Sequence, residues 1–518
     1  MEIKSKNIHQ EERKGKNSLF VTLDEDFNVP DTKPDMEYIL RQWGEVHQEL
    51  IRCEDGKVGV SARLDFAVMY QGARLDNLNG GIDINEKVNV DGITADAKPA
   101  CNLKLEDLTI KMIHSRKISV KAVVEIEIVW EELCDYQIGS EVDNEGQVQV
   151  LGENIDIAQL KVITNDSIRV KEEIAIPGGK PNIGRILWKE INLCHVEDRM
   201  QEEGVRISGE IKSFIIYEAD NDEGTISWLE AATSFDSTVA VSGITSDMIG
   251  KVKAVLESAN IDIKTDSDGE ARLFVLEAIV GVSIKAYEEV SLPIIKDLYV
   301  PLKDVTLVKT PLKLRKLAMK NNSRCRCSKR SKINSMSSKD GSILSICNVS
   351  GDVRVQMVSR VEDGIEVNGL VDAKVFFVTA NDGMPWESVS VTFPFSHVIE
   401  CRNMSEKCIF EVEGRLEDIS CMMVGTDEIE FKALISLNAI CFDQVLIESL
   451  ESAQVVEMQD RDYMAIPGMI GYVVKESDTL WSIAKKSHTT CEKIKSINKL
   501  TSDKVNCGDK LLLIKESR

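Results

Sequence analysis

Catalytic motifs are missing from this 518-residue sequence: carboxylates are abundant, but no sequence feature singles out a pair of them for glycoside hydrolysis. Its six histidines stand far apart, and none forms an H-x-x-x-H pair or a Cys/His group at zinc spacing. No P-loop, no G-x-G-x-x-G after a strand and no G-x-S-x-G motif occurs. Asp266-x-Asp268-Gly269 resembles half a calcium loop, but Lys264 and Val275 would occupy its first and last ligand positions, so we interpret it as a hairpin turn. The sequence therefore predicts a non-enzymatic protein without a metal site or cofactor.

Long apolar runs are also missing. No stretch of about 18 uncharged apolar residues occurs, so we expect no membrane-spanning helix. Residues 1–18 are polar and charged, which predicts a flexible N-terminus without a secretory signal. The thirteen cysteines are odd in number and irregularly spaced, which favours free thiols in the reducing cytosol.

Basic residues are outnumbered by acidic ones. The chain has 63 Lys and Arg against 86 Asp and Glu, a formal net charge of −23, which argues against a nucleic-acid partner. Residues 471–518 reverse the balance with ten basic and six acidic residues, so this segment carries +4 and the remainder −27. A basic C-terminal module on an acidic body could attract an acidic partner, although a solvated face would explain the same charges.

What the sequence does contain is an internal repeat. The segment V-P-D-T-K-P-D-M-E-Y-I-L at residues 29–40 returns 147 residues later as I-P-G-G-K-P-N-I-G-R-I-L at 176–187. The same offset aligns two further pairs of blocks: 57–60 with 204–207, and 66–70 with 213–217. A constant offset over three separated blocks, at a period above about 100 residues, indicates tandem domains.

A third copy lies 160 residues beyond the second. G-I-E-V-N-G at 364–369 matches G-V-R-I-S-G at 204–209, although Ser337 and Gly341 stand where both prolines would fall. Most blocks alternate or are β-branched, and Asp/Asn/Gly clusters at 220–224, 266–269 and 381–383 are typical of hairpin turns. Each copy ends in a long apolar strand candidate: Val120–Trp130, Phe274–Tyr287 and Phe431–Phe442. We therefore predict a mainly β fold of three tandem antiparallel β-rich repeat domains, each opened by the proline-bounded segment and a short helix.

A basic segment separates the second and third copies. Residues 309–332 contain ten Lys and Arg and no acidic residue, and they include Cys325-x-Cys327. Contact with an anionic surface or a thiol site would explain this composition, as would a local irregularity of the sequence. An exposed linker is the interpretation we favour.

The C-terminal segment has a different pattern. Asp478 or Thr479 can cap a first helix that carries Leu480, Ile483 and Ala484 at helical spacing. A second helix is predicted to start near Thr489, with Glu492 completing a capping box, and to bury Ile494 and Ile497. Gly508 then turns the chain into a closing apolar strand. The order is strand, helix, helix, strand.

The run Asp478-Thr479-Leu480-Trp481-x-Ile483-Ala484, with Asn498 and a closing G-x-x-L, resembles the LysM module, a small βααβ fold of proteins that bind N-acetylglucosamine polymers such as peptidoglycan. Ser477 and Cys507 depart from the Gly and Pro that the family usually has. The resemblance implies a binding groove, with Trp481 as an aromatic anchor, formed by Ser477, Asp478, Thr479, Leu480, Trp481, Lys485, Asn498, Lys499 and Leu500. Core packing is the alternative role for Trp481.

The repeats, with their P-x-x-K-P-x-[MI]-x-x-I-L opening, resemble the SPOCS domain. Three such repeats followed by one LysM module resemble a family of spore-coat morphogenetic proteins of clostridial endospore formers. The resemblance implies a coat-assembly scaffold in the mother cell cytoplasm, recruited to the forespore surface, where its LysM module docks onto the coat morphogenetic ATPase and its repeats meet other coat proteins.

Two other functions remain open. One is a peptidoglycan-binding protein of the cortex or cell wall, and the other is a wall hydrolase with a LysM targeting tail. The predicted organisation is a flexible N-terminus (1–18), β repeats at 19–165 and 166–308, a basic linker at 309–335, a third β repeat at 336–455 and the LysM module at 470–516.

Overall fold

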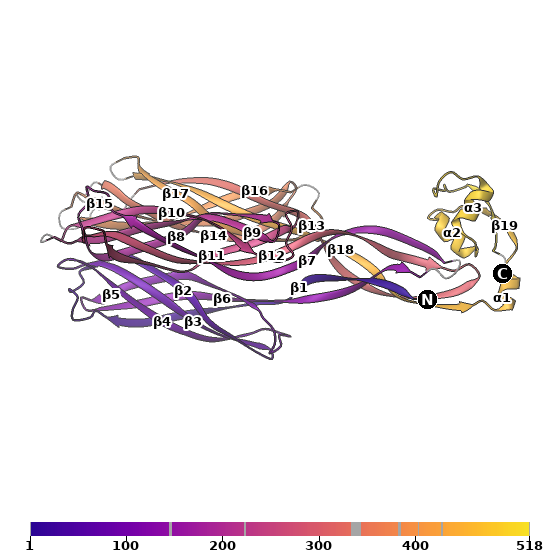
Figure 1. The fold of residues 1–518 in the computed structure, drawn as a ribbon, viewed down its shortest axis with the longest axis horizontal. Helices are drawn as coiled ribbons and strands as arrows, with labels where there is room; N and C mark the ends of the chain where they lie inside the picture. Colours follow the sequence, from indigo (N-terminus) through magenta and orange to yellow (C-terminus); the bar gives the residue numbers. More distant parts are fainter. Residues whose placement is uncertain are drawn as a thin grey trace.

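The computed structural model describes residues 2–143, 148–221, 224–332, 343–381, 385–401, 404–425 and 428–516. The molecule is elongated: a thick body of strands narrows into a stalk, and a small helical module sits at the stalk's far end (Figure 1). Within the described residues, every helix lies in the C-terminal part of the chain.

Repeat 1 consists of two three-stranded antiparallel sheets that enclose a core. One sheet has the order β2 (Tyr38–Glu54), β3 (Lys57–Gln71), β4 (Leu75–Asn89), and the other has the order β1 (Ile3–Asn28), β6 (Lys117–Val142), β5 (Ala100–His114). Strand β3 shows why these residues form sheet: Val58, Val60, Ala62 and Leu64 alternate with polar residues and are buried. The residues between them are half-buried, and towards the end of β3 Met69 on that opposite face is buried against the neighbouring repeats.

Repeats 2 and 3 have the same topology. In repeat 2 the sheets are β8 (Ile183–Gln201), β9 (Gly204–Ala219), β10 (Ile226–Ala240) and β7 (Gln149–Ala175), β12 (Ala271–Tyr299), β11 (Ile249–Thr265). In repeat 3 they are β14 (Ile343–Val361), β15 (Gly364–Thr379), β16 (Trp386–Glu400) and β13 (Lys303–Lys332), β18 (Glu428–Glu457), β17 (Ile409–Met423). The predicted fold class is confirmed. The predicted short helix is wrong: no helix lies in the described parts of the repeats, and in repeat 1 the chain passes from a turn at 31–33 through the non-helical residues 34–37 into β2.

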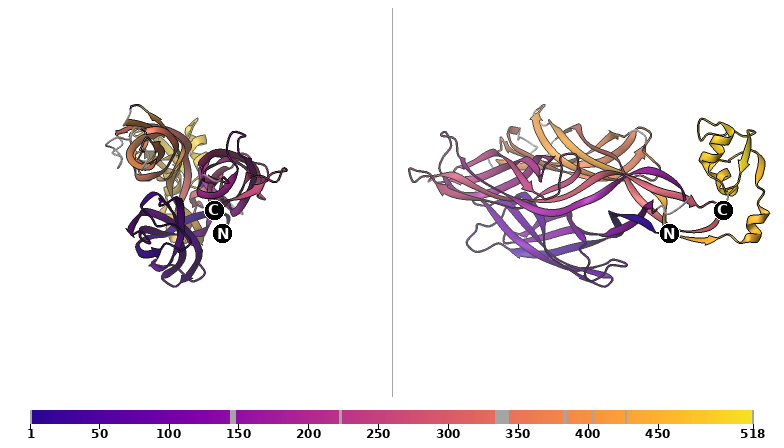
Figure 2. Two further views of the ribbon diagram at one scale, coloured as in Figure 1. Left: turned by 90° about the vertical axis from the view of Figure 1, so that its left-hand side faces the viewer. Right: turned by 45° about the vertical axis from the view of Figure 1, so that its right-hand side comes forward.

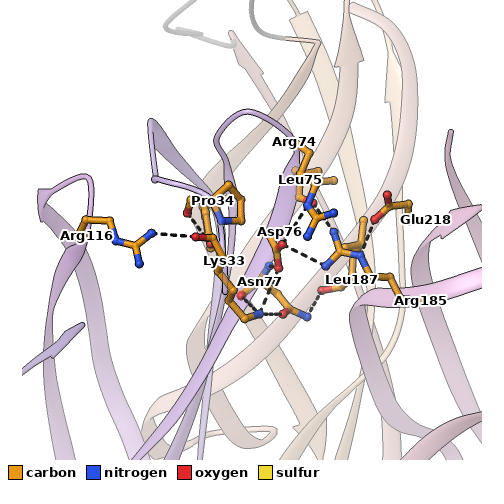
Figure 3. A network of polar contacts seen from close by, with 11 residues as sticks. Lys33, Pro34, Arg74, Leu75, Asp76, Asn77, Arg116, Arg185, Leu187 and Glu218 are labelled. Atoms are coloured by element: carbon orange, nitrogen blue, oxygen red, sulfur yellow. Dashed lines mark hydrogen bonds and ion pairs between the residues drawn. The ribbon is translucent and has the colours of Figure 1, made fainter. Parts of the chain in front are cut away.

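A polar network holds the proline-bounded motif in each of the first two repeats, and Figure 3 shows the network of repeat 1. Lys33 donates to the carbonyl and side-chain oxygens of Asn77 at 2.5 and 2.8 Å, and Arg116 donates to the Lys33 carbonyl at 2.8 Å. In repeat 2, Lys180 and Arg272 make the corresponding contacts. The repeated lysine is therefore structural: it ties the loop to the first residues of the neighbouring strand.

The three repeats surround a common axis, as the end-on view in Figure 2 shows. The repeat offsets carry Arg41 to Trp188 and on to Asn348, and these three equivalent residues meet at the axis. Arg41 is 5% exposed, forms an ion pair with Glu190 at 2.7 Å and lies 5.3 Å from the Trp188 ring centre. The polar centre of the body is thus shared by all three repeats.

Beyond the body, the long strands form the stalk as three two-stranded ribbons: residues 3–13 with 131–142, 149–160 with 287–299, and 303–317 with 442–457. Aliphatic side chains from all three ribbons fill its interior: Ile8, Ile138, Ile157, Leu292, Ile294, Leu314 and Ile447.

The prediction of a flexible N-terminus is wrong for the described residues up to 18, because Ile8 is buried in the stalk and β1 is paired along its length. Strand β7 also begins at Gln149, inside the span predicted for repeat 1.

The basic segment is not a linker where the structure describes it. Residues 309–332 belong to β13, which pairs with β18 from Lys303 onward. Their cations meet acidic side chains of repeats 2 and 3, in the pairs Lys316–Asp156 (3.0 Å), Lys320–Asp198 (3.2 Å), Arg324–Glu417 (3.2 Å) and Arg330–Glu430 (2.9 Å). The composition that indicated a solvated linker instead compensates an acidic body. Ser337, Gly341 and the predicted start of repeat 3 at 336 lie outside the described residues.

The hairpin interpretation of Asp266–Gly269 is confirmed. Asp266 Oδ1 accepts from the backbone N–H of Asp268 at 3.0 Å and of Glu270 at 3.1 Å. Gly269 has φ +83°, a conformation that favours glycine. The turn connects β11 to β12.

Candidate docking site on the C-terminal module

The module follows the end of β18 through the short helix α1 (Asp460–Ala465). Strands β19 (Met469–Val473) and β20 (Lys510–Ile514) pair antiparallel, and α2 (Leu480–Lys486) and α3 (Cys491–Asn498) stand between them in the chain. The buried centre consists of aliphatic residues from α2, α3 and β20 and from the residue that follows β19: Val474, Leu480, Ile483, Ala484, Ile494, Leu511 and Leu513. The predicted βααβ fold is confirmed.

Helix α2 begins with a reciprocal cap. The Thr479 side chain accepts from the Ser482 N–H at 3.1 Å, and the Ser482 hydroxyl accepts from the Thr479 N–H at 3.0 Å. Asp478, the other predicted cap, instead accepts from the Tyr472 hydroxyl at 2.6 Å and the Lys475 N–H at 3.0 Å. The Tyr472 hydrogen bond, more than any other contact, holds the pKa of Asp478 below its ordinary value.

Helix α3 begins one residue later than predicted. Thr490 is the N-cap and accepts from the Lys493 N–H at 3.2 Å, so the predicted capping box between Thr489 and Glu492 is wrong. Asn498 at the other end fixes α3 to β20, because its side chain accepts from the Leu512 N–H at 2.7 Å and donates to the Leu512 carbonyl at 2.8 Å.

The nine predicted groove residues fall into three groups. Ser477, Thr479 and Lys499 are exposed. Leu480 is only 2% exposed and belongs to the core. The remaining five are half-buried: Asp478, Trp481, Lys485, Asn498 and Leu500.

Backbone geometry explains why the LysM family usually has glycine where this chain has Ser477. Ser477 has φ +71°, in the left-handed region that favours glycine, which is the usual family residue at this position. Lys499 is also left-handed, with φ +54°, and forms the C-cap of α3.

Two of the half-buried residues contact the stalk. Trp481 donates from its indole N–H to Asp297 Oδ2 at 2.8 Å, and Lys485 Nζ lies 2.7 Å from Asp297 Oδ1. The Tyr299 ring packs edge-to-face against the Trp481 ring, with the ring centroids 4.8 Å apart. The Tyr299 hydroxyl donates to the Thr489 carbonyl at 2.9 Å. We call these contacts the stalk–module contact. Sequence reasoning missed it, since nothing in the pattern around Asp297 distinguishes it from other strand ends.

Electrostatics of the stalk–module contact favour an ionised Asp297. Burial opposes ionisation, but the hydrogen bonds from Lys485 and Trp481 outweigh it and hold the pKa of Asp297 below its ordinary value. Tyr299 is 4% exposed, and burial raises the pKa of its hydroxyl. The contact therefore joins a carboxylate to two donors and a neutral tyrosine to a carbonyl.

Comparison with protein families now adds an independent observation. The model described as SipL, SPOCS domain, matches residues 35–113, 182–264 and 342–424, and the LysM domain model matches residues 472–513. The chain has a SipL-type architecture. Each SPOCS match covers the four shorter strands of its repeat and leaves out the two long strands that build the stalk. No curated protein and no solved structure matches the chain.

The SPOCS and LysM domains of this SipL-type chain fit a sporulation coat protein, and a LysM domain is compatible with peptidoglycan binding. The matched families indicate no enzyme class. In the described part of the chain, no three His, Cys, Asp or Glu side chains are grouped to hold a metal ion. Nor do the described residues include a helix with the length and apolar content needed to cross a bilayer.

Two cavities lie between neighbouring SPOCS repeats of the SipL-type body. A cavity of about 760 Å³ lies between repeats 1 and 2 and is lined by Trp43, Glu257 and Asn260 among others. One of about 680 Å³ separates repeats 2 and 3, with Glu190 and Arg415 in its lining. Both occur where the outer face of one repeat meets the edge of the next, so they follow from the arrangement around the axis.

Proposed function

We propose that this SipL-type chain is a non-enzymatic scaffold of spore coat assembly that acts from the mother cell cytoplasm and docks through its LysM domain onto the coat morphogenetic ATPase at the forespore surface. The observation that carries the proposal is the position of the LysM domain. It projects from the end of the stalk, away from the three SPOCS repeats, where a partner can reach it without meeting the body (Figure 1).

The exposed loop residues Ser477, Thr479 and Lys499 offer the accessible part of the docking surface. Lys499 is the charged member, and the module's excess of basic residues favours an acidic surface on the partner. Leu480 and Asn498 act indirectly, because Leu480 fills the core and Asn498 ties α3 to β20. The SPOCS repeats would meet other coat proteins.

The test compares two charge reversals in the full-length chain. Lys499→Glu changes an exposed loop residue, whereas the matched control Lys510→Glu changes an exposed residue of β20. We expect Lys499→Glu to weaken binding to the purified ATPase about tenfold, mainly through the association rate, and Lys510→Glu to change it less than about twofold. Equal binding of Lys499→Glu and the unmodified chain would contradict the proposed docking surface.

Peptidoglycan binding is the second candidate, and the LysM match favours it. Sedimentation of the full-length chain with insoluble peptidoglycan distinguishes the two. Retention on peptidoglycan without binding to the ATPase would replace the docking proposal. Binding to the ATPase without retention would establish a glycan-binding fold that recognises a protein.

A further inference from the structure

The side of the LysM domain that carries Trp481 already has an occupant. We infer that Trp481 and Lys485 form a docking surface for a strand end that presents a carboxylate and a tyrosine two residues apart, and that the chain's own Asp297 and Tyr299 fill it. The inference rests on the proposed function in one respect: an outside partner that uses Trp481 must displace the β12 end.

The occupant is presented by the geometry of β12. Residues two apart on a strand point to the same side, so Asp297 and Tyr299 face the module together. The pairing of β12 with β7 shifts register between Ile295 and Asp297, which makes Lys296 an extra residue at a β-bulge. Bulges redirect the side chains that follow them, and this one lies directly before the two contact residues.

The recognition is chemically specific. An indole N–H and an ammonium group converge on one carboxylate, and the tyrosine places its ring edge on Trp481 while its hydroxyl reaches a backbone carbonyl. Hydrogen bonds to charged groups are the stronger class, and the pair of donors requires an acceptor of negative charge. A neutral or basic strand end would leave Lys485 unpaired.

The contact is also separable. The two partners lie on different elements, because Asp297 belongs to β12 and Trp481, 184 positions later, belongs to α2 of the module that follows β18. The Lys485 and Asp297 side chains are 41% and 22% exposed, and water can therefore replace their hydrogen bonds. Of the residues in the module's apolar cluster, only Tyr299 comes from the stalk. Such a contact can open without unfolding the module.

The first experiment needs no outside partner. A labelled peptide of residues 293–303, PIIKDLYVPLK, is titrated into the full-length chain and followed by fluorescence anisotropy. We expect Asp297→Ala to bind the peptide about tenfold more tightly than the unmodified chain, because its own strand end no longer holds the surface. Lys296→Gln is the matched control: Lys296 pairs with Glu153 of the stalk and not with the module, so its binding should equal that of the unmodified chain.

Two results would overturn the docking surface. One is equal peptide binding by Asp297→Ala and the unmodified chain, with hydrogen exchange showing that α3 remains protected and the module folded. The other is equal binding of a peptide in which the aspartate is replaced by asparagine, which would remove the claim that a carboxylate is recognised. Preference for the unchanged peptide supports it.

The same variants then test displacement by the coat ATPase. If the ATPase uses Trp481, Asp297→Ala should bind it about tenfold more tightly and Lys296→Gln should not change. If Asp297→Ala binds the ATPase as the unmodified chain does while Lys499→Glu binds it more weakly, the ATPase does not displace the β12 end. The loop surface would then be the docking site. Peptide binding without any ATPase binding would overturn the proposed function and retain the Asp-x-Tyr surface.

Discussion

The SPOCS body and the LysM domain are held together in different ways. The body has three clusters of buried residues, one for each repeat, and a polar centre that all three share. The module has one small cluster and uses a tyrosine of the stalk to complete it. The difference shows that the body is stabilised by contacts between its three similar repeats. The module is stabilised partly by its contact with Tyr299 of the stalk.

The largest effect should come from breaking the centre of the body. Arg41→Ala leaves the Glu190 side chain, which is only 12% exposed, without its cation, and the loss of one partner from such a pair typically costs about 3–5 kcal/mol of unfolding free energy. Arg63→Ala is the control, because this arginine pairs with Asp65 and Asp83 at the surface, where ion pairs contribute little to stability, so the variant should unfold almost as the unmodified chain does. Hydrogen exchange of β3 and α3 amides separates the regions: Arg41→Ala should accelerate exchange in β3 and leave α3 unchanged. Faster exchange in both β3 and α3 would show that the module unfolds together with the body.

Leu480→Ala should produce the opposite pattern. Removing this buried leucine leaves a cavity in the module and should destabilise it by about 2–5 kcal/mol, with no effect on β3. Leu512→Ala, at a position that is 38% exposed, should cost much less. The measurement is again exchange of α3 amides. Similar losses from both variants would mean that the module has no defined core.

Acid should weaken the stalk–module contact. The pKa of Asp297 is lowered below its ordinary value of 3.8, so its contribution is fully present above that value and is lost as pH falls through the lower, folded-state pKa. At neutral pH, Asp297→Asn should therefore cost the module about 1.5–3 kcal/mol. Calorimetry of the module's transition should show the difference from the unmodified chain shrinking as the pH is lowered below 3.8. A difference independent of pH would exclude a role for the charge.

Tyr299→Phe should have a smaller effect. It removes one hydrogen bond to the Thr489 carbonyl and keeps the ring contact with Trp481, so the expected cost is about 1 kcal/mol. Tyr472→Phe is the matched change inside the module, because Tyr472 donates to Asp478. Denaturant midpoints of the module report both. If Tyr299→Phe has no effect, the ring and not the hydroxyl carries the contact.

Ser477→Gly should give the smallest change, and in the stabilising direction. A serine at φ +71° is strained, and glycine relieves the strain at the cost of greater freedom in the unfolded chain, for a net gain of about 0.5 kcal/mol. Ser487→Gly is a suitable control, since Ser487 ends α2 with φ −98°. A loss of stability in Ser477→Gly would show that the serine side chain has a structural role.

The sequence was most informative where one pattern recurs. The offset between copies identified repeat domains, and alternation identified their strands, because half-buried sheet imposes a period of two on every copy. The same reasoning placed Leu480, Ile483 and Ala484 in the core of a βααβ module. It located the start of α3 only to within one residue, since Thr489 and Thr490 are both suitable caps.

Patterns failed where burial comes from another repeat. Residues 3–13 are polar enough to suggest a flexible end, yet Ile8 is buried by the neighbouring ribbons. The basic run in β13 suggested a linker because the acidic residues that balance it lie far away in the sequence. The stalk–module contact was missed for the same reason: Asp297 and Trp481 are brought together only by the full fold.

The stalk also fixes a length. From Tyr287 to Tyr299, β12 continues as a paired ribbon for 12 residue steps, which at about 3.3 Å each amounts to roughly 40 Å. Because three ribbons share one apolar interior, this length cannot shorten as a flexible tether would. The stalk therefore holds the LysM domain and the SPOCS repeats at a set distance from each other along the molecule.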